Sequence, residues 1–216
     1  MNWAAPLDVY CERTDASLWA EPVNALTNLA FIAAAAWLLR RMDRHTPADL
    51  RALAWLIGLV GAGSGVFHTV AQAWAAVLDV VFIAAFVVLF LQRALVRLAG
   101  WSARTASAAV LGVLLVSAAI AATVKPSALN GSELYLGPWL ALIGLGLACP
   151  VPPARRWLIA AAALFGISML LRSIDLAVCE AFPLGTHFGW HVNNALVLWC
   201  GMRALMHHTH DQTPRG

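Results

Sequence analysis

Residues 80–91 read VVFIAAFVVLFL, twelve apolar side chains in succession. A strand of a membrane barrel alternates apolar and polar residues, so an unbroken apolar run predicts a helix instead. Outward from this run, apolar stretches near the length that crosses a bilayer, about 17 to 25 residues, recur along the chain. The sequence therefore predicts an all-α membrane protein.

The overall composition points the same way. Of the 216 residues, 61% are hydrophobic and only 12% are charged, and the mean hydropathy is +0.74. A water-soluble domain carries about twice that share of charged residues, so a soluble protein is excluded. The sequence contains no visible second domain, linker or repeat, and the predicted partner of the chain is the bilayer itself.

We predict a bundle of seven transmembrane helices with short polar connections. Pro138 lies near the start of the fifth helix, and Pro150 follows its end at a length near the lower limit for a span. An extracytoplasmic segment, 1–20, precedes the bundle of 21–206, and a cytoplasmic tail, 207–216, follows it. The predicted spans are 21–39, 53–72, 75–92, 105–124, 135–149, 157–175 and 188–206.

The distribution of basic residues predicts the orientation, because Lys and Arg resist translocation. Eleven arginines lie in the odd-numbered loops or at the C-terminus, whereas the other face has only Arg13, Lys125 and Arg172. This bias places the N-terminus outside and the C-terminus in the cytoplasm. It also explains the net charge of +3 without a nucleic-acid partner. The eleven are Arg40, Arg41, Arg44, Arg51, Arg93, Arg97, Arg104, Arg155, Arg156, Arg203 and Arg215.

Polar groups inside membrane helices are candidates for function, since an ionisable one costs about 2.5 to 3.5 kcal/mol on insertion scales. Ser64 and His68 stand four residues apart in the second helix, so both side chains lie on one helical face. Asp79 lies about one turn below the outer end of the third helix, at the depth of His68. The hairpin therefore brings an acid and an imidazole together.

His187 and His191 open the last helix as a second pair four residues apart, a spacing that suits two ligands of one metal ion. A single His in a helix is more often a hydrogen-bonded core residue than a ligand. Here, however, separate helices place all these groups at the same end of the bundle. We therefore predict a zinc site held by His68, His187 and His191.

Three neutral imidazoles with an open fourth position are typical of catalytic zinc, which lowers the pKa of its water to about 7. Asp79 is either a fourth ligand or the base that takes the proton of this water. Ser64 is either a donor to a developing oxyanion or a small packing residue among glycines. The predicted chemistry is hydrolysis.

Two further features lie on the predicted outer face. Cys11 and Cys179 both map there, and a bridge between them is compatible with an oxidising compartment, although the sequence does not place them within bonding distance. The acidic residues before the first helix include Asp8, Glu12 and Glu21. Their oxygens suit calcium, or else they gather at a helix start because the helix dipole favours them.

Taken together, these patterns resemble the alkaline ceramidases. They also resemble, more loosely, the wider superfamily of membrane hydrolases that includes the adiponectin and progestin receptor relatives. The resemblance extends from about residue 8 to about residue 200. The segments that carry it are Asp-Val-Tyr-Cys11-Glu12, Trp-Ala-Glu21-Pro-Val-Asn24, Ser64-x-x-x-His68 with Asp79 eleven residues later, and His187-x-x-x-His191.

The resemblance implies hydrolysis of ceramide, or of a related lipid amide, to a sphingoid base and a free fatty acid. It implies that Asp79 activates the attacking water and that Ser64 lies near the substrate carbonyl. The zinc ligands that it implies are His68, His187 and His191.

The resemblance also bears on the outer segment. It implies a calcium site that includes Glu12 and Glu21, with Asp8 standing one residue further from Cys11 than the family pattern has it. It favours the bridge between Cys11 and Cys179.

Other functions fit part of the pattern. A receptor-like or regulatory membrane protein would hold a structural zinc and bind a lipid without cleaving it. A transporter would line a path with His and Asp, but here the polar residues cluster at one end. Haem binding would need facing histidines at two depths. The Ala- and Arg-rich composition with a single Lys predicts a bacterial source, and hence an inner-membrane protein whose site faces the periplasm.

Overall fold

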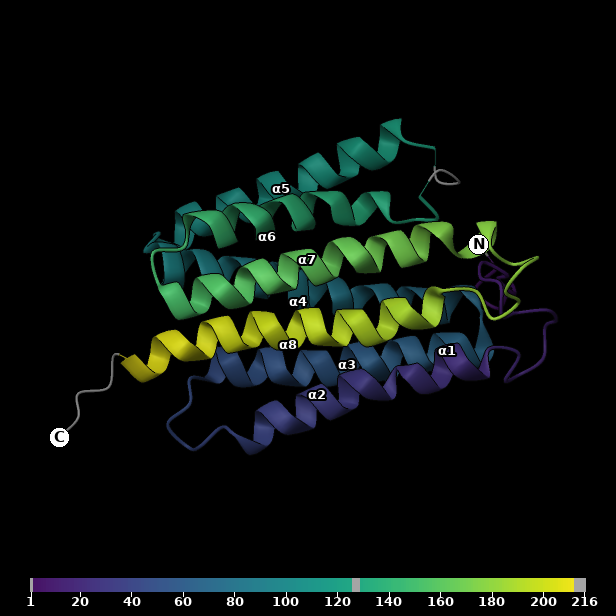
Figure 1. Ribbon diagram of the computed structural model, residues 1–216, viewed down its shortest axis with the longest axis horizontal. Helices are drawn as coiled ribbons and strands as arrows, with labels where there is room; N and C mark the ends of the chain where they lie inside the picture. Colours follow the sequence, from purple (N-terminus) through teal and green to yellow (C-terminus); the bar gives the residue numbers. More distant parts are fainter. Residues whose placement is uncertain (1, 126–128, 212–216) are drawn as a thin grey trace.

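The chain forms a bundle of helices that run side by side along one axis (Figure 1). The computed structural model describes residues 2–125 and 129–211, with side chains up to residue 207. Within these ranges the structure is helical, and the one β pairing is an isolated bridge between Pro6 and Gln72. The all-α prediction is therefore confirmed.

The helices follow the predicted segments, with one break and some displaced ends. In the described ranges they are α1 (Pro22–Thr27), α2 (Leu29–Arg40), α3 (Ala48–Val70), α4 (Ala73–Ala99), α5 (Ala103–Thr123), α6 (Leu136–Ala148), α7 (Pro152–Ile174) and α8 (His187–Asp211). Two 3-10 turns, η2 (Glu133–Tyr135) and η3 (Asp175–Ala177), accompany them.

The first predicted span, 21–39, is two helices instead of one. In a continuous helix the Asn24 carbonyl would accept the backbone amide of Asn28. Here it accepts Asn28 Nδ2 at 2.9 Å, and the Thr27 hydroxyl, which shares its one proton with the Val23 carbonyl, lies 3.1 Å away. Side chains that enter the backbone ladder in this way interrupt a helix, so α1 ends at Thr27 and α2 begins at Leu29.

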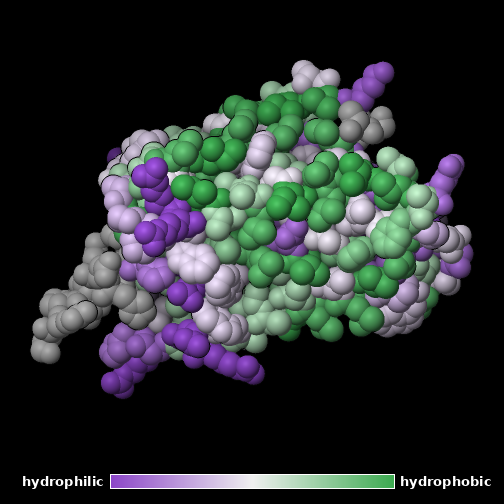
Figure 2. Space-filling view, in the orientation of Figure 1, coloured by the Kyte–Doolittle hydropathy of each residue, from purple (hydrophilic) through white to green (hydrophobic). Residues whose placement is uncertain are grey.

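Five helical segments of the described chain are long and apolar enough to cross a membrane. Figure 2 shows hydrophobic side chains over the middle of the bundle and a gathering of hydrophilic ones at the end where α8 finishes. This is the surface of a membrane protein. The five segments are Pro22–Arg40, Ala48–Val70, Ala73–Ala99, Ala103–Thr123 and Pro152–Ala177.

The two remaining predicted spans fall short of that criterion for different reasons. The helix at the predicted span 135–149 covers only Glu133–Ala148, including its 3-10 turn. The last helix, α8, has 25 residues but carries histidines and asparagines that lower its hydropathy. It also continues to Asp211, so residues 207–211 of the predicted tail are helical, while 212–216 lie outside the described residues.

A close backbone approach sets α3 against the break between α1 and α2. A Cβ at Gly61 would lie 2.7 Å from the Phe31 Cβ and 2.8 Å from the Asn28 carbonyl oxygen. Only glycine therefore allows the helices to pack at this distance. The approach brings the end of α3, which carries His68, next to α1.

Candidate metal centre

Three imidazoles from two helices meet at one end of the bundle. His68 lies near the end of α3, while His187 and His191 occupy the first turns of α8, and each is about 1% exposed. Their ring centroids are 4.6 to 5.1 Å apart, and one nitrogen of each ring lies within 4.8 Å of the others. These three residues can hold a metal ion, as the sequence predicted.

Hydrogen bonds on the far side of two rings direct their lone pairs toward this group. His68 Nδ1 lies 2.5 Å from Glu21 Oε2, and His191 Nδ1 lies 2.9 Å from Thr27 Oγ1. An ionised carboxylate only accepts, and the Thr27 hydroxyl already donates to the Val23 carbonyl at 2.8 Å. Each Nδ1 therefore carries the proton, which leaves each Nε2 as the metal-binding atom.

The third imidazole is held by stacking. The ring of His187 packs on the phenol of Tyr10, with 3.5 Å between centroids and 14° between planes. Burial raises the pKa of Tyr10, so this ring stays neutral. Among the residues that the structure describes, His187 Nδ1 and His191 Nε2 are buried without a hydrogen-bond partner. Buried nitrogens without partners are rare, and a metal ion at this position would satisfy both.

Behind His68 lies a buried ion pair. Glu21 is completely buried, and its Oε1 accepts from Arg13 Nε at 2.6 Å while its Oε2 accepts from His68 Nδ1 and, at 3.1 Å, from Asn24 Nδ2. A carboxylate behind a ligand His orients the ring and raises its basicity. This role was missed in the sequence, because the pairing joins residues 47 positions apart.

The structure does not gather the three acids of the predicted calcium site. Asp8 is exposed, whereas the two oxygens of Glu12 accept from the backbone amides of Val23 at 2.6 Å and Asn24 at 2.8 Å. Glu12 thus caps the start of α1, as the helix-dipole alternative expects. Within the described residues, the histidines alone form a group close enough for a metal ion. Calcium at Asp8, Glu12 and Glu21 stays a prediction.

Asp79 and Ser64 lie together near the histidines, although Asp79 is not a member of the ligand group. Ser64 is buried, and Asp79 Oδ1 is buried without a hydrogen-bond partner among the described residues. The positive charge of Arg172 acts on this carboxylate. An acid with one unpaired oxygen beside a metal site is suited to accept a proton.

Arg172 also lies at the metal-centre end of the bundle. This position was not predicted from the sequence, because Arg172 was considered there only as a charge on the outer face. Its guanidinium lies over three aromatic rings, 5.7 Å from the centroid of Tyr10, 5.7 Å from Tyr135 and 5.1 Å from Trp190. Cation–π contacts of this kind hold a charge in place away from water. They keep a positive charge close to Asp79.

A disulfide and a buried acid fix the start of α8. Cys11 and Cys179 are bonded, with 5.3 Å between their Cα atoms. Asp175 is completely buried; its Oδ2 accepts from the Cys11 amide at 3.0 Å, and its Oδ1 accepts from the amides of Thr186 at 2.6 Å and His187 at 2.9 Å. Asp175 therefore ties the N-terminal segment to the helix that carries two of the histidines.

We expect Asp175→Asn to weaken metal binding about 10- to 100-fold, as outer-shell substitutions do, because the amide of His187 loses a charged acceptor. Competition with a graded chelator measures this affinity. Asp43→Asn is the matched control, since Asp43 also accepts two backbone amides, those of His45 and Thr46 at 2.9 Å each, but in an exposed loop at the other end. Equal losses in both variants would contradict a positioning role for Asp175.

Comparison with known proteins does not identify the function of this chain. No family model matches this chain, and no curated protein matches it. The likeness to the alkaline ceramidases therefore stays a prediction from the motifs.

Proposed function

We propose that this protein is a zinc-dependent hydrolase that cleaves the amide bond of ceramide or a related lipid amide within the membrane. The observation that supports it is the buried trio of His68, His187 and His191 near the carboxylate of Asp79, whose Oδ1 has no hydrogen-bond partner among the described residues. Three imidazoles without a thiolate are typical of catalytic zinc rather than structural zinc. When bound there, zinc supplies a Lewis acid that polarises a carbonyl and acidifies water.

The residues around the trio supply proton transfer and charge stabilisation. Asp79 takes a proton from water as the water oxygen attacks the amide carbon, and then delivers that proton to the departing amine nitrogen. Ser64, which lies near Asp79, donates to the carbonyl oxygen as negative charge develops. The products are a sphingoid base and a free fatty acid.

The position of the site in the bundle suits a lipid substrate. The histidines lie at the end of α3 and the start of α8, which are at one end of the bundle (Figure 1), and this end matches the depth of an amide at the membrane interface. The two hydrocarbon chains of the substrate remain among lipid tails and apolar helix surfaces. Little apolar area is then transferred to water during binding, so the cost of admitting the substrate is small.

We further propose that α6 and α8 also cross the membrane, which makes seven spans, with the N-terminus outside. The eleven-to-three distribution of basic residues supports this orientation. The Cys11–Cys179 bridge supports it as well, because it lies at the metal-centre end and disulfides persist in oxidising compartments. In a bacterial inner membrane, the site then faces the periplasm.

The alternative is a receptor-like or regulatory protein that binds a lipid around a structural zinc. One observation favours it: the three histidines are each about 1% exposed, and structural zinc sites are closed to solvent. Such a protein would hold the metal and the lipid without turnover.

The test is to quantify zinc in the protein purified in detergent and to measure fatty acid release from a fluorescent ceramide. We expect about one zinc per chain, with release that stops on chelation and returns when zinc is restored. Stoichiometric zinc with no release from ceramides or other lipid amides would support the receptor-like alternative. A protein without zinc would refute the metal site.

A further inference from the structure

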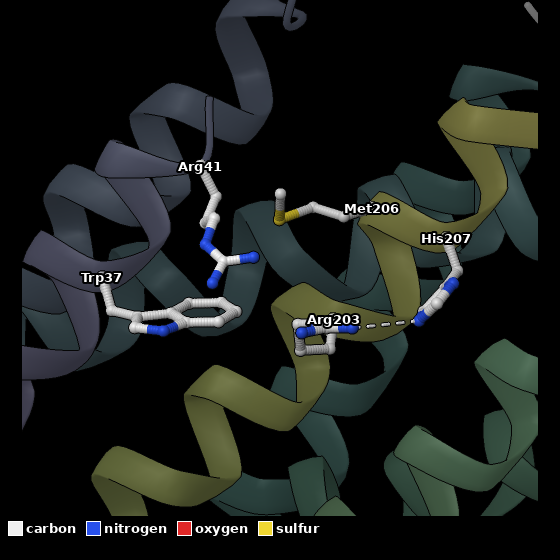
Figure 3. A pocket seen from close by; sticks show the side chains of 5 residues that line it. All are labelled: Trp37, Arg41, Arg203, Met206 and His207. Carbon is white, nitrogen blue, oxygen red and sulfur yellow. Dashed lines mark hydrogen bonds between the residues drawn. The ribbon is translucent and has the colours of Figure 1, made fainter. Parts of the chain in front are cut away.

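A second polar site lies at the opposite end of the bundle from the metal centre. A hollow of about 220 Å³ opens there between the end of α2 and the last turns of α8. Figure 3 shows its lining, with two guanidinium groups near one indole ring. The lining residues are Trp37, Arg41, Arg203, Met206 and His207.

Arg203 is held rigidly in this hollow. Its Cζ atom lies 5.4 Å from the ring centroid of Trp37, 5.3 Å from Trp157 and 5.5 Å from Trp199, and its Nη2 is 3.3 Å from His207 Nε2. The indole of Trp199 also contacts those of Trp37 and Trp157 edge-on. A planar guanidinium fixed among aromatic faces loses little conformational entropy when it binds a ligand.

Arg41 brings a second positive charge to the same indole. Its Cζ lies 4.8 Å from the Trp37 ring centroid. Among the side chains that the structure describes, no carboxylate lies within 4.0 Å of Arg41 or Arg203, whereas Arg93 and Arg97 at this end both pair with Asp49. The positive charges of Arg41 and Arg203, which both lie near the Trp37 ring, therefore favour the binding of an anion between them.

We propose that this hollow binds the phosphate group of an anionic phospholipid headgroup. Arginine forks match phosphate oxygens, and basic pockets between membrane helices recognise such headgroups. Tryptophans prefer the membrane interface, which puts the hollow at headgroup depth. The apolar side of the bundle next to it accommodates the acyl chains, which a soluble phosphate lacks (Figure 2). The assignment is independent of any hydrolysis at the metal centre.

The test compares Arg41→Gln with Arg40→Gln. Both residues lie at the end of α2 and are exposed, and both substitutions remove one charge, but of the two only Arg41 has a cation–π contact with Trp37 in the described structure. Native mass spectrometry of the protein in detergent counts the phosphatidylglycerol retained, with phosphatidylcholine of the same chains for comparison. We expect wild type to prefer phosphatidylglycerol, Arg41→Gln to bind it about tenfold more weakly, and Arg40→Gln to match wild type.

Three outcomes would overturn the assignment. Equal losses in the two variants would mean that the lipid responds only to overall charge. Equal retention of phosphatidylcholine would mean that the phosphate and its negative charge are not recognised. Saturation by inorganic phosphate with no preference for phosphatidylglycerol would assign the hollow to a soluble anion. Arg203→Lys, which keeps the charge but loses the planar fork, is expected to lose part of the preference.

Discussion

Replacing His191 with alanine is expected to leave the purified protein without zinc, while the wild type retains about one ion per chain. His191 supplies one of three ligand nitrogens, and its Nε2 is buried without any other partner. The loss should exceed the roughly 10- to 100-fold that follows substitution of an outer-shell residue, because a first-shell ligand is removed. Elemental analysis of the protein after dialysis against a weak chelator measures it.

The control for this variant is His207→Ala, on the same helix but at the other end, beside Arg203. It should retain zinc. Short His-rich tracts also bind metal adventitiously. A variant in which alanine replaces His207, His208 and His210 therefore distinguishes zinc bound by the C-terminal tail from zinc bound at the proposed centre. Zinc that survives in His191→Ala but disappears with the three C-terminal histidines would place the ion in the tail and contradict the proposed centre.

Thermal unfolding gives a second measure of the same loss. A ligand that binds only the folded state stabilises it by about 2.7 kcal/mol when its free concentration is a hundred times the Kd. Added zinc should therefore raise the unfolding temperature of chelator-treated wild type. It should leave His191→Ala unchanged, because the affinity of the remaining pair is too low at the same zinc concentration.

The helices could be predicted from the sequence because the bilayer imposes a length and a hydropathy on each span. The run at 80–91 lies inside α4, which extends beyond the predicted 75–92 at both ends. The break at Asn28 was missed, since it arises from side-chain hydrogen bonds to the Asn24 carbonyl that leave hydropathy unchanged. Hydropathy averaged over a stretch of sequence predicts transfer into lipid, but it does not detect individual hydrogen bonds.

The ligand group was predictable for a geometric reason. His187 and His191 share a helical face by their spacing, and topology puts His68 at the same depth. The outer partners were not predictable, because Glu21 reaches His68 across 47 positions and Thr27 reaches His191 across 164. Those pairings depend on how closely α3 and α8 approach α1, and the sequence pattern alone contains no such distance.

Asp79→Asn is expected to lower the rate of amide hydrolysis by roughly 10²- to 10⁴-fold while zinc stays bound. Asparagine has the same shape, but it cannot take a proton from water. Asp79 is outside the group of three histidines, so the metal loses no ligand. The turnover number and the zinc content of the same preparation are the two measurements.

Asp49→Asn controls for the loss of an acid from a membrane helix, because Asp49 pairs with Arg93 and Arg97 at the end away from the histidines. That variant should turn over ceramide at the wild-type rate. If Asp79→Asn kept full activity, another group would have to be the base. If it lost both activity and zinc, Asp79 would be a fourth ligand instead. Zinc retained with activity lost is the combination that a receptor-like protein cannot give, since a purely structural ion supports no turnover to lose.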